Sequence, residues 1–333
     1  MPGFTVVVVT HNRAAVLRDT LAALGRLSYS GSWDVLVVDN NSEDATKRTV
    51  EETARQFPVP LRYLFVGTPG KYYALNAGVE AADSSYIAAT DDDAFPEPDW
   101  LDRAAEGFRT YGCDFVGGPV FPVWRGAPPR WLNARSATTG KVLGLQDYGG
   151  SAVEYGRNGI SWPLGVNVAY RRDAFERAGS FDARLGRVAG TLRNQSQREW
   201  HLRARTAGLT GMYLPAMKVH HCVEAERLTR SYFRRWFYWH GISRAILYQT
   251  KGLHLIEPES ERSHDGERHV LNVPVSVWRE AGRAAASAGK RWLLGRADDA
   301  LHYELLLCFC AGVLRQRLRD RRTPLPHEAL APR

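Results

Sequence analysis

The sequence predicts an α/β protein with a mostly parallel sheet flanked by helices, followed by a helical C-terminal region. Two observations support this fold class. In the first half, β-branched apolar runs alternate with segments whose apolar residues recur at helical spacing, as is typical of βαβ units. After residue 222 the strand patterns stop, and Arg and aromatic residues become frequent. With 333 residues and 44% hydrophobic content, the chain can form one large domain or two ordinary ones.

Four buried strands are predicted in the first half. The run Phe4–Thr10 is continuously apolar and β-branched, as expected for a strand that is buried on both faces. The other three predicted strands are Trp33–Val38, Leu61–Val66 and Tyr86–Thr90. The predicted helices are Ala14–Leu27, a segment from about Asp44 to before Pro58, Ala74–Ala82, and a helix that starts near Trp100.

The second half is less regular. Residues 117–165 are rich in Gly, Pro and Trp, which indicates a long loop or excursion near an active site. Regular structure is then expected over Leu164–Arg171, Asp173–Ala178, Gln197–Ala207 and Thr210–Leu214. Beyond these, Arg230–Gln249 and Val277–Arg321 are predicted to be helical, and the polar stretch Glu257–Arg268 separates them.

Each predicted strand of the first half is followed by polar residues. The clusters are Thr10–Arg13, Asp39–Asn41, Gly70-Lys71 and Asp91–Asp93. Ligands bind beyond the carboxyl ends of parallel strands, so we expect these clusters to share one edge of the sheet. Three adjacent carboxylates at a buried strand end repel one another, and a hard divalent cation would offset that repulsion. An acidic turn before the helix near Trp100 is the alternative, but the neighbouring polar clusters favour a site.

Six motifs occur in a fixed order along residues 4–221: Val6–Arg13, Val37–Ser42, Gly70–Gly78, Thr90–Asp93, Gly165–Arg172 and Gly179–Asp182. Together they resemble the family 2 glycosyltransferases, which are inverting enzymes of the GT-A fold. The resemblance implies a GT-A catalytic domain over residues 1–222, with a nucleotide-sugar-binding half to about 117 and an acceptor half over 118–222. Residues 223–333 would form a basic, aromatic-rich helical region.

The resemblance also implies an activity: metal-dependent transfer of a sugar from a nucleotide-diphosphate donor to a hydroxyl of a glycan, a lipid-linked molecule or a small natural product. Mn²⁺ or Mg²⁺ would be the cofactor. Two alternatives are a degenerate GT-A protein that binds nucleotide sugar or glycan without turnover, and a sugar-1-phosphate nucleotidyltransferase. The second is disfavoured because Thr10–Arg13 contains no glycine.

The resemblance assigns roles to individual residues. The donor-binding candidates are Thr10, Asn12, Arg13, Asp39, Asn41, Lys71, Asn76, Asp91 and Asp92. Asp91 would face the ribose, whereas Asp92 also suits a structural role. Asp39 could accept from a base N–H or cap a turn, and Lys71 could meet the base or a phosphate or be an exposed lysine. The metal candidates are Asp93, Asp91 and His221; His220 and His221 should point to opposite faces of a strand, so only one can reach the metal.

The catalytic base is not evident from the sequence. An inverting transferase needs a carboxylate to deprotonate the acceptor hydroxyl, but the family's acidic pair falls on Ser196-Gln197. Glu199, one turn further on, is the preferred candidate, and Asp182 in the preceding loop is another. Alternatively, the acceptor is a phosphate or carboxylate that needs no strong base.

The net charge of +8 is concentrated near the C-terminus. Residues 223–333 carry 19 Lys and Arg against 13 Asp and Glu, which accounts for six of the eight excess positive charges. The segment Arg230–His240 interleaves cations with aromatics and could lie at a membrane interface or pack as a core helix. Nucleic acid is not expected as a partner, because no recognition motif accompanies the charge. No signal-peptide pattern follows Met1, and the four cysteines (Cys113, Cys222, Cys308, Cys310) lack metal-site spacing. We therefore expect a cytoplasmic protein. If this region contacts a membrane, the contact would be peripheral and on its inner face.

Overall fold

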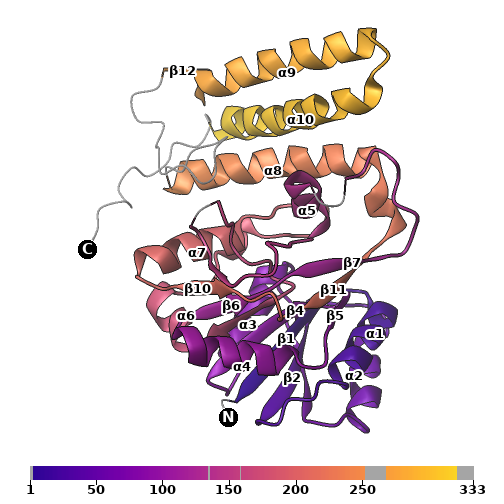
Figure 1. Cartoon of the computed structure of the whole chain (residues 1–333), viewed down its shortest axis with the longest axis vertical. Helices are drawn as coiled ribbons and strands as arrows, with labels where there is room; N and C mark the ends of the chain where they lie inside the picture. The colour runs from indigo at the N-terminus through magenta and orange to yellow at the C-terminus, as the bar shows by residue number, and fades with distance from the viewer. Residues whose placement is uncertain (1–2, 134–135, 158, 252–267, 321–333) are drawn as a thin grey trace. The chain divides into compact units, whose positions relative to one another are not determined.

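The computed structural model describes residues 3–133, 136–157, 159–251 and 268–320 (Figure 1). The chain forms two compact units. One comprises Met1–Ala189 with Ser196–Ala225, and the other comprises Gly190–Gln195 with Glu226–Arg333. We call them the sheet unit and the helical unit.

An eight-stranded sheet in the order β3-β2-β1-β4-β9-β6-β10-β8 forms the centre of the sheet unit (Figure 1). Its first four strands are mutually parallel: β1 (Phe4–Thr10), β2 (Trp33–Asp39), β3 (Leu61–Phe65) and β4 (Tyr86–Asp91). The other four are β6 (Phe115–Gly117), β8 (Val153–Glu154), β9 (Val168–Arg171) and β10 (Gly211–Tyr213). Of these, β9 is antiparallel to both β4 and β6, whereas β10 is parallel to β6. The predicted α/β fold with a mostly parallel sheet is therefore confirmed.

The β-branched sequence of β1 is explained by its burial. Val6, Val7 and Val8 are fully inaccessible, because helices cover both faces of the sheet at its centre. The helices of this unit are α1 (Ala14–Leu24), α2 (Thr46–Ala54), α3 (Lys71–Glu80), α4 (Trp100–Tyr111), α5 (Ala137–Leu143), α6 (Asp173–Ala178) and α7 (Ser196–Thr206). Helix α3 starts three residues earlier than predicted, because Gly70 turns the chain at φ +138°.

The region 117–165 is more structured than its composition suggests. Besides α5 and β8 it contains β7 (Val120–Trp124), which pairs with β11 (Val219–Val223). Strand β11 also pairs with β5 (Ala94–Pro96), so a second sheet in the order β5-β11-β7 forms directly after the acidic run. This small sheet brings residues 220–222 next to residues 93–95, which lie far away in the sequence.

The helical unit contains α8 (Arg230–Lys251), α9 (Val275–Leu293), α10 (Ala297–Asp320) and a hairpin of β12 (His269–Val270) and β13 (Val273–Pro274). Helix α10 packs against both α8 and α9 (Figure 1). The helical stretch predicted over Val277–Arg321 is broken, because Gly295 adopts φ +69° and ends α9. The polar stretch predicted over Glu257–Arg268 lies, apart from Arg268, outside the described residues. No helix in the described ranges is both long and apolar enough to cross a bilayer.

Candidate active site

The predicted polar clusters meet at one edge of the sheet. The register of β1 and β2 pairs Thr10 with Asp39, and that of β1 and β4 pairs Val9 with Asp91. The strands therefore end at the same level, and the loops that follow them converge. This is the edge at which parallel sheets bind ligands.

The acidic run at the end of β4 is neutralised mainly by Arg13. The guanidinium donates to Asp92 Oδ1 at 2.5 Å and to Asp93 Oδ2 at 3.0 Å, and both carboxylates are 7% exposed. Thr10 Oγ1 donates to Asp92 Oδ2 at 2.8 Å. Burial raises the pKa of Asp92, and its neighbour Asp93 adds to that rise while Arg13 opposes it. Burial disfavours the charge on Arg13, but the two carboxylates raise its pKa above the ordinary value.

Asp91 faces a different partner. Its Oδ1 accepts a 2.5 Å contact from Lys71 Nζ at the start of α3. Although burial disfavours the charged amine, the Asp91 carboxylate raises the pKa of Lys71. Both side chains line a small cavity of about 10 Å³, roughly enough for one water. Tyr72, Tyr170 and Gln197 are also on its wall.

Asp93 lies beside a histidine from the second sheet. His221 Nε2 is 3.2 Å from Asp93 Oδ1, and the imidazole is 5% exposed. His220 instead contacts Glu97 at 2.7 Å, so the two adjacent histidines do point apart. Among the described residues, His221 Nδ1 has no hydrogen-bond partner.

Asp93 and His221 are the candidate metal ligands that the structure brings together. In the described part of the chain, no group of three or more His, Cys, Asp or Glu side chains is arranged to hold a metal ion. A buried carboxylate oxygen and an imidazole nitrogen 3.2 Å apart nevertheless supply two donors of the types that bind divalent cations. The remaining ligands would have to come from substrate or water, so the residues fit a metal that is held jointly with a diphosphate.

Asp39 is held by its own loop and by β3. One of its oxygens accepts from Ser42 N at 2.9 Å, and the other accepts from Tyr63 Oη at 2.8 Å. Asn12 and Asn41 both adopt positive φ, of 52° and 63°. Asn12 N donates to Ser42 Oγ, and Asn12 Oδ1 accepts from Glu43 N, so Asn12 joins the loop after β1 to the loop after β2.

Two asparagines brace this edge. Asn76 on α3 donates to the carbonyl of Phe181 and accepts from its N–H, which holds the loop after α6 against α3. Asn40, which sequence reasoning did not single out, is buried and bonds to Thr68 O and Gly70 N. It fixes the turn that leads into Lys71. The sequence signal was an asparagine directly after a predicted buried strand.

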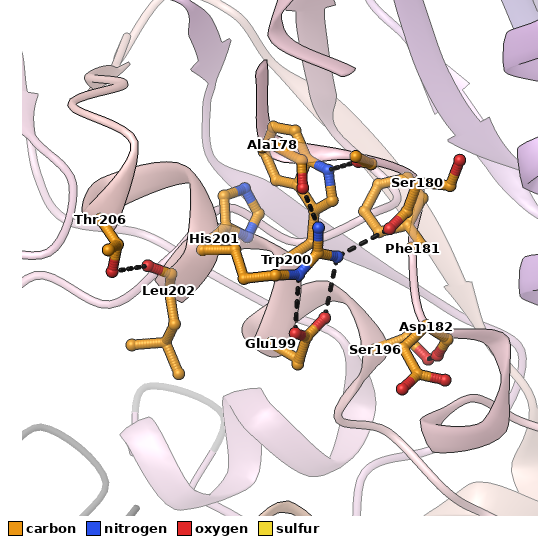
Figure 2. A network of polar contacts seen from close by, with 12 residues as sticks. Ala178, Ser180, Phe181, Asp182, Ser196, Glu199, Trp200, His201, Leu202 and Thr206 are labelled. Carbon is orange, nitrogen blue, oxygen red and sulfur yellow. Dashed lines mark hydrogen bonds and ion pairs between the residues drawn. The ribbon is translucent and has the colours of Figure 1, made fainter. Parts of the chain in front are cut away.

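Glu199 lies in the polar network of Figure 2. Its side chain is 2% exposed, and its two oxygens accept from Arg203 Nε at 2.7 Å and Nη2 at 2.9 Å. Arg203 also donates to the carbonyls of Ala178 and Ser180. The ion pair therefore ties α7 to the end of α6, a structural task that competes with a role as base.

Asp182 occupies a more open position. It caps the 3₁₀ turn Ala183–Leu185, and its carboxylate accepts from Arg184 Nε and Nη2 at 2.9 and 2.7 Å. Arg184 is 78% exposed. Further along the same segment, the carbonyl of Arg187 accepts from Lys71 N, which joins this segment to the start of α3.

Gln197 occupies the position at which the family's acidic pair is expected. Its amide approaches Tyr170 Oη at 3.4 Å and lines the same cavity as Asp91 and Lys71. An amide cannot accept a proton near neutral pH, so this side chain can orient a ligand but cannot act as a general base.

Two curated relatives are glycosyltransferases of Haloferax volcanii. Glycosyltransferase AglE is 34% identical over 125 residues, covering 36% of this chain and 40% of that protein. Glucosyl-dolichyl phosphate glucuronosyltransferase is 26% identical over 187 residues, covering 55% and 57%. The matched segment thus spans between 40% and 57% of the length of these relatives.

Solved structures with a similar fold include the mannosyltransferase PcManGT from Pyrobaculum calidifontis in complex with GDP-Man and Mn²⁺. Its TM-score is 0.52 at 18% identity, and the match covers 98% of this chain and 76% of that one. GalNAc-T7 with UDP, GalNAc and Mn²⁺ gives a TM-score of 0.53 at 13% identity, covering 78% and 52%. At these identities the likeness concerns the fold, which is that of the GT-A transferases.

The family model described as "Glycosyl transferase family 2" matches residues 5–179, which include β4, the acidic run and all of β1 except Phe4. The resemblance seen in the sequence motifs is thereby confirmed, and the chain belongs to glycosyl transferase family 2.

Proposed function

We propose that this chain is a metal-dependent, inverting glycosyltransferase that moves a sugar from a nucleotide-diphosphate donor to an acceptor hydroxyl. The observation that carries the proposal is the convergence of Lys71, Asp91, Asp93 and His221 at one sheet edge. These residues offer cationic, acidic and metal-binding groups to a ligand that has a ribose and a diphosphate. The family membership supports the same reaction class, and residues 1–222 would form the catalytic domain.

The family resemblance suggests the donor-binding roles, and the contacts of these residues are compatible with them. Asp39 lies farthest along the edge, next to Tyr63, and would meet the base. Asp91 would meet the ribose while Lys71 turns toward the phosphates. Thr10 and Arg13 would hold the acidic run in place through Asp92.

A divalent cation at Asp93 and His221 would neutralise the negative charge that develops on the diphosphate leaving group. The mixed oxygen and nitrogen donor set favours Mn²⁺ over Mg²⁺, because imidazole is a poor ligand for magnesium. PcManGT and GalNAc-T7 were both solved with Mn²⁺, which supports the choice.

The catalytic base stays a prediction with two candidates. Releasing Glu199 requires breaking a buried bidentate pair with Arg203, whereas Asp182 is paired with the exposed Arg184. The Asp182 side chain is 19% exposed and that of Glu199 is 2% exposed. Because an ion pair near the surface is held less strongly than a buried one, the Asp182 carboxylate is the easier of the two to free. We therefore propose Asp182 ahead of Glu199.

The amide of Gln197 keeps a second candidate function open: binding of nucleotide sugar or glycan without turnover. A thermal-shift screen of nucleoside diphosphates and their sugars, with and without Mn²⁺, tests donor binding. A ligand at 100 times its Kd stabilises the fold by about 2.7 kcal/mol, or roughly 5–10 °C for a unit of this size. Release of nucleoside diphosphate from the donor that binds then separates an enzyme from a binding protein.

Asp93→Asn should abolish the Mn²⁺-dependent part of the shift. Asp99→Asn is the matched control, because Asp99 pairs with Arg103 on the exposed surface of α4 and should leave the shift unchanged. A Mn²⁺-dependent shift that survives Asp93→Asn contradicts the metal assignment.

A further inference from the structure

The C-terminal end of α9 and the turn that follows it expose three consecutive apolar residues. Trp292 is 53% exposed, Leu293 is 91% exposed and Leu294 is 60% exposed. A run of this kind costs solubility, so it is rare on a protein surface without a function. We call these three residues the apolar tip.

Hydrogen bonds within the helical unit hold the apolar tip. The turn is closed by backbone hydrogen bonds from Gly295 N to Trp292 O and from Arg296 N to Arg291 O. The indole N–H of Trp292 donates to Glu304 on α10 at 2.9 Å. The polar atom of the tryptophan is therefore satisfied within the helical unit, while its ring stays half exposed.

Basic side chains surround the apolar tip. Lys290, Arg291 and Arg296 line a groove of about 460 Å³ between the ends of α9 and α10, together with the acidic Asp299. The guanidinium carbon of Arg291 lies 4.4 Å from the centre of the Tyr303 ring, on which it stacks. Within the described residues neither Lys290 nor Arg296 takes part in an ion pair, so both charges are available to an anionic partner.

We propose that the α9–α10 turn docks onto an anionic lipid bilayer. Apolar side chains that lead a structured turn, with cations just behind them, match the two layers of a membrane surface. The leucines would enter the acyl boundary, Trp292 would lie at the level of the headgroups, and the basic residues would meet lipid phosphates. The contact is shallow and one-sided, since no helix in the described ranges can span the bilayer. The proposal does not depend on the transferase reaction.

Co-flotation of the full chain with vesicles tests the proposal. Binding is expected to vesicles of phosphatidylcholine with phosphatidylglycerol, more weakly to pure phosphatidylcholine, and to fall as salt rises. Changing Leu293 and Leu294 together to Ser should lower the partition constant about tenfold or more, because apolar burial is lost. Leu318→Ser is the matched control, as Leu318 is 44% exposed elsewhere on α10.

The charge component has its own pair of variants. Lys290→Glu with Arg296→Glu should lower binding to the anionic vesicles about tenfold or more, but leave binding to neutral vesicles nearly unchanged. Arg283→Glu is the control on the same helix, since Arg283 is 78% exposed and lies seven residues before Lys290. Trp292→Phe should reduce quenching of the protein fluorescence by brominated lipids.

Three outcomes overturn the proposal. The first is failure of the parent chain to float with anionic vesicles. The second is equal binding by the parent and the double leucine variant. The third is self-association of the parent that the leucine substitutions abolish without any effect of lipid, which would make the apolar tip an interface between copies of the chain.

Discussion

Replacing Glu199 by Gln distinguishes a structural carboxylate from a catalytic one. The two oxygens of Glu199 accept from Arg203, and the same guanidinium bonds to the carbonyls of Ala178 and Ser180 (Figure 2). A glutamine keeps one acceptor but turns an N–H₂ donor toward the other guanidinium N–H. The arginine also loses its counter-charge in a site where Glu199 is 2% exposed.

The size of the effect follows from the burial of the pair. Removing one partner of a buried ion pair costs about 3–5 kcal/mol, and the 29% exposure of Arg203 reduces this to roughly 2–4 kcal/mol. For a unit of about 200 residues, that corresponds to a fall in Tm of about 5–15 °C. Changing both Glu199 and Arg203 to Met should recover part of the loss, because no charge is then left unpaired.

The assay has two readouts, Tm by calorimetry and the transfer rate well below the Tm of the variant. If Glu199 is structural, the Glu199→Gln variant should have a lower Tm and a transfer rate within about threefold of the parent. If Glu199 is the general base, the variant should lose about 10²–10⁴-fold in transfer rate. Asp182→Asn is the counterpart, and it should change Tm by only a few degrees yet abolish transfer if Asp182 is the base. A Glu199→Gln variant that melts like the parent but has lost transfer refutes this reasoning and makes Glu199 the base.

Three further predictions concern the stability of each unit. Arg13→Met leaves Asp92 and Asp93 without their main counter-charge and should lower the free energy of unfolding by roughly 2–4 kcal/mol. Mn²⁺ should raise the Tm of this variant more than that of the parent, because the ion replaces the lost positive charge; an equal rise would contradict the expectation that Arg13 and the metal neutralise the same carboxylates. Burial lowers the pKa of His201 to about 3, so between that value and its ordinary 6.5 the unfolded chain binds more protons. Stability is then full above about pH 6.5 and falls by about 1.4 kcal/mol per pH unit below it, a slope that unfolding curves of His201→Phe should lack. Gly241→Leu should melt the helical unit, because a side chain there would overlap the backbone of α10; a folded variant with parental helicity would show that the contact is not needed.

The strands, and the meeting of the polar clusters at one sheet edge, were predictable because each depended on local sequence. A buried parallel strand has to be continuously apolar, and its ligand-binding residues follow it directly, so Phe4–Thr10 and Asp91–Asp93 could be recognised from a few consecutive residues. The contact of Asp93 with His221 was less accessible. It depends on the pairing of β5 with β11, between segments more than 120 residues apart.

The catalytic base could not be predicted from the sequence, for a physical reason. A carboxylate in a helix can face a substrate or an arginine, and packing decides between the two. Arg203 follows Glu199 at the i,i+4 spacing of a helical ion pair, so the sequence did hold the signal for a structural role. Asp182 differs from Glu199 in the same respect: its partner Arg184 is 78% exposed, whereas the partner of Glu199 also donates to two backbone carbonyls. A base must exchange its partner for a substrate hydroxyl in every turnover, and the more weakly held of the two carboxylates meets that requirement better.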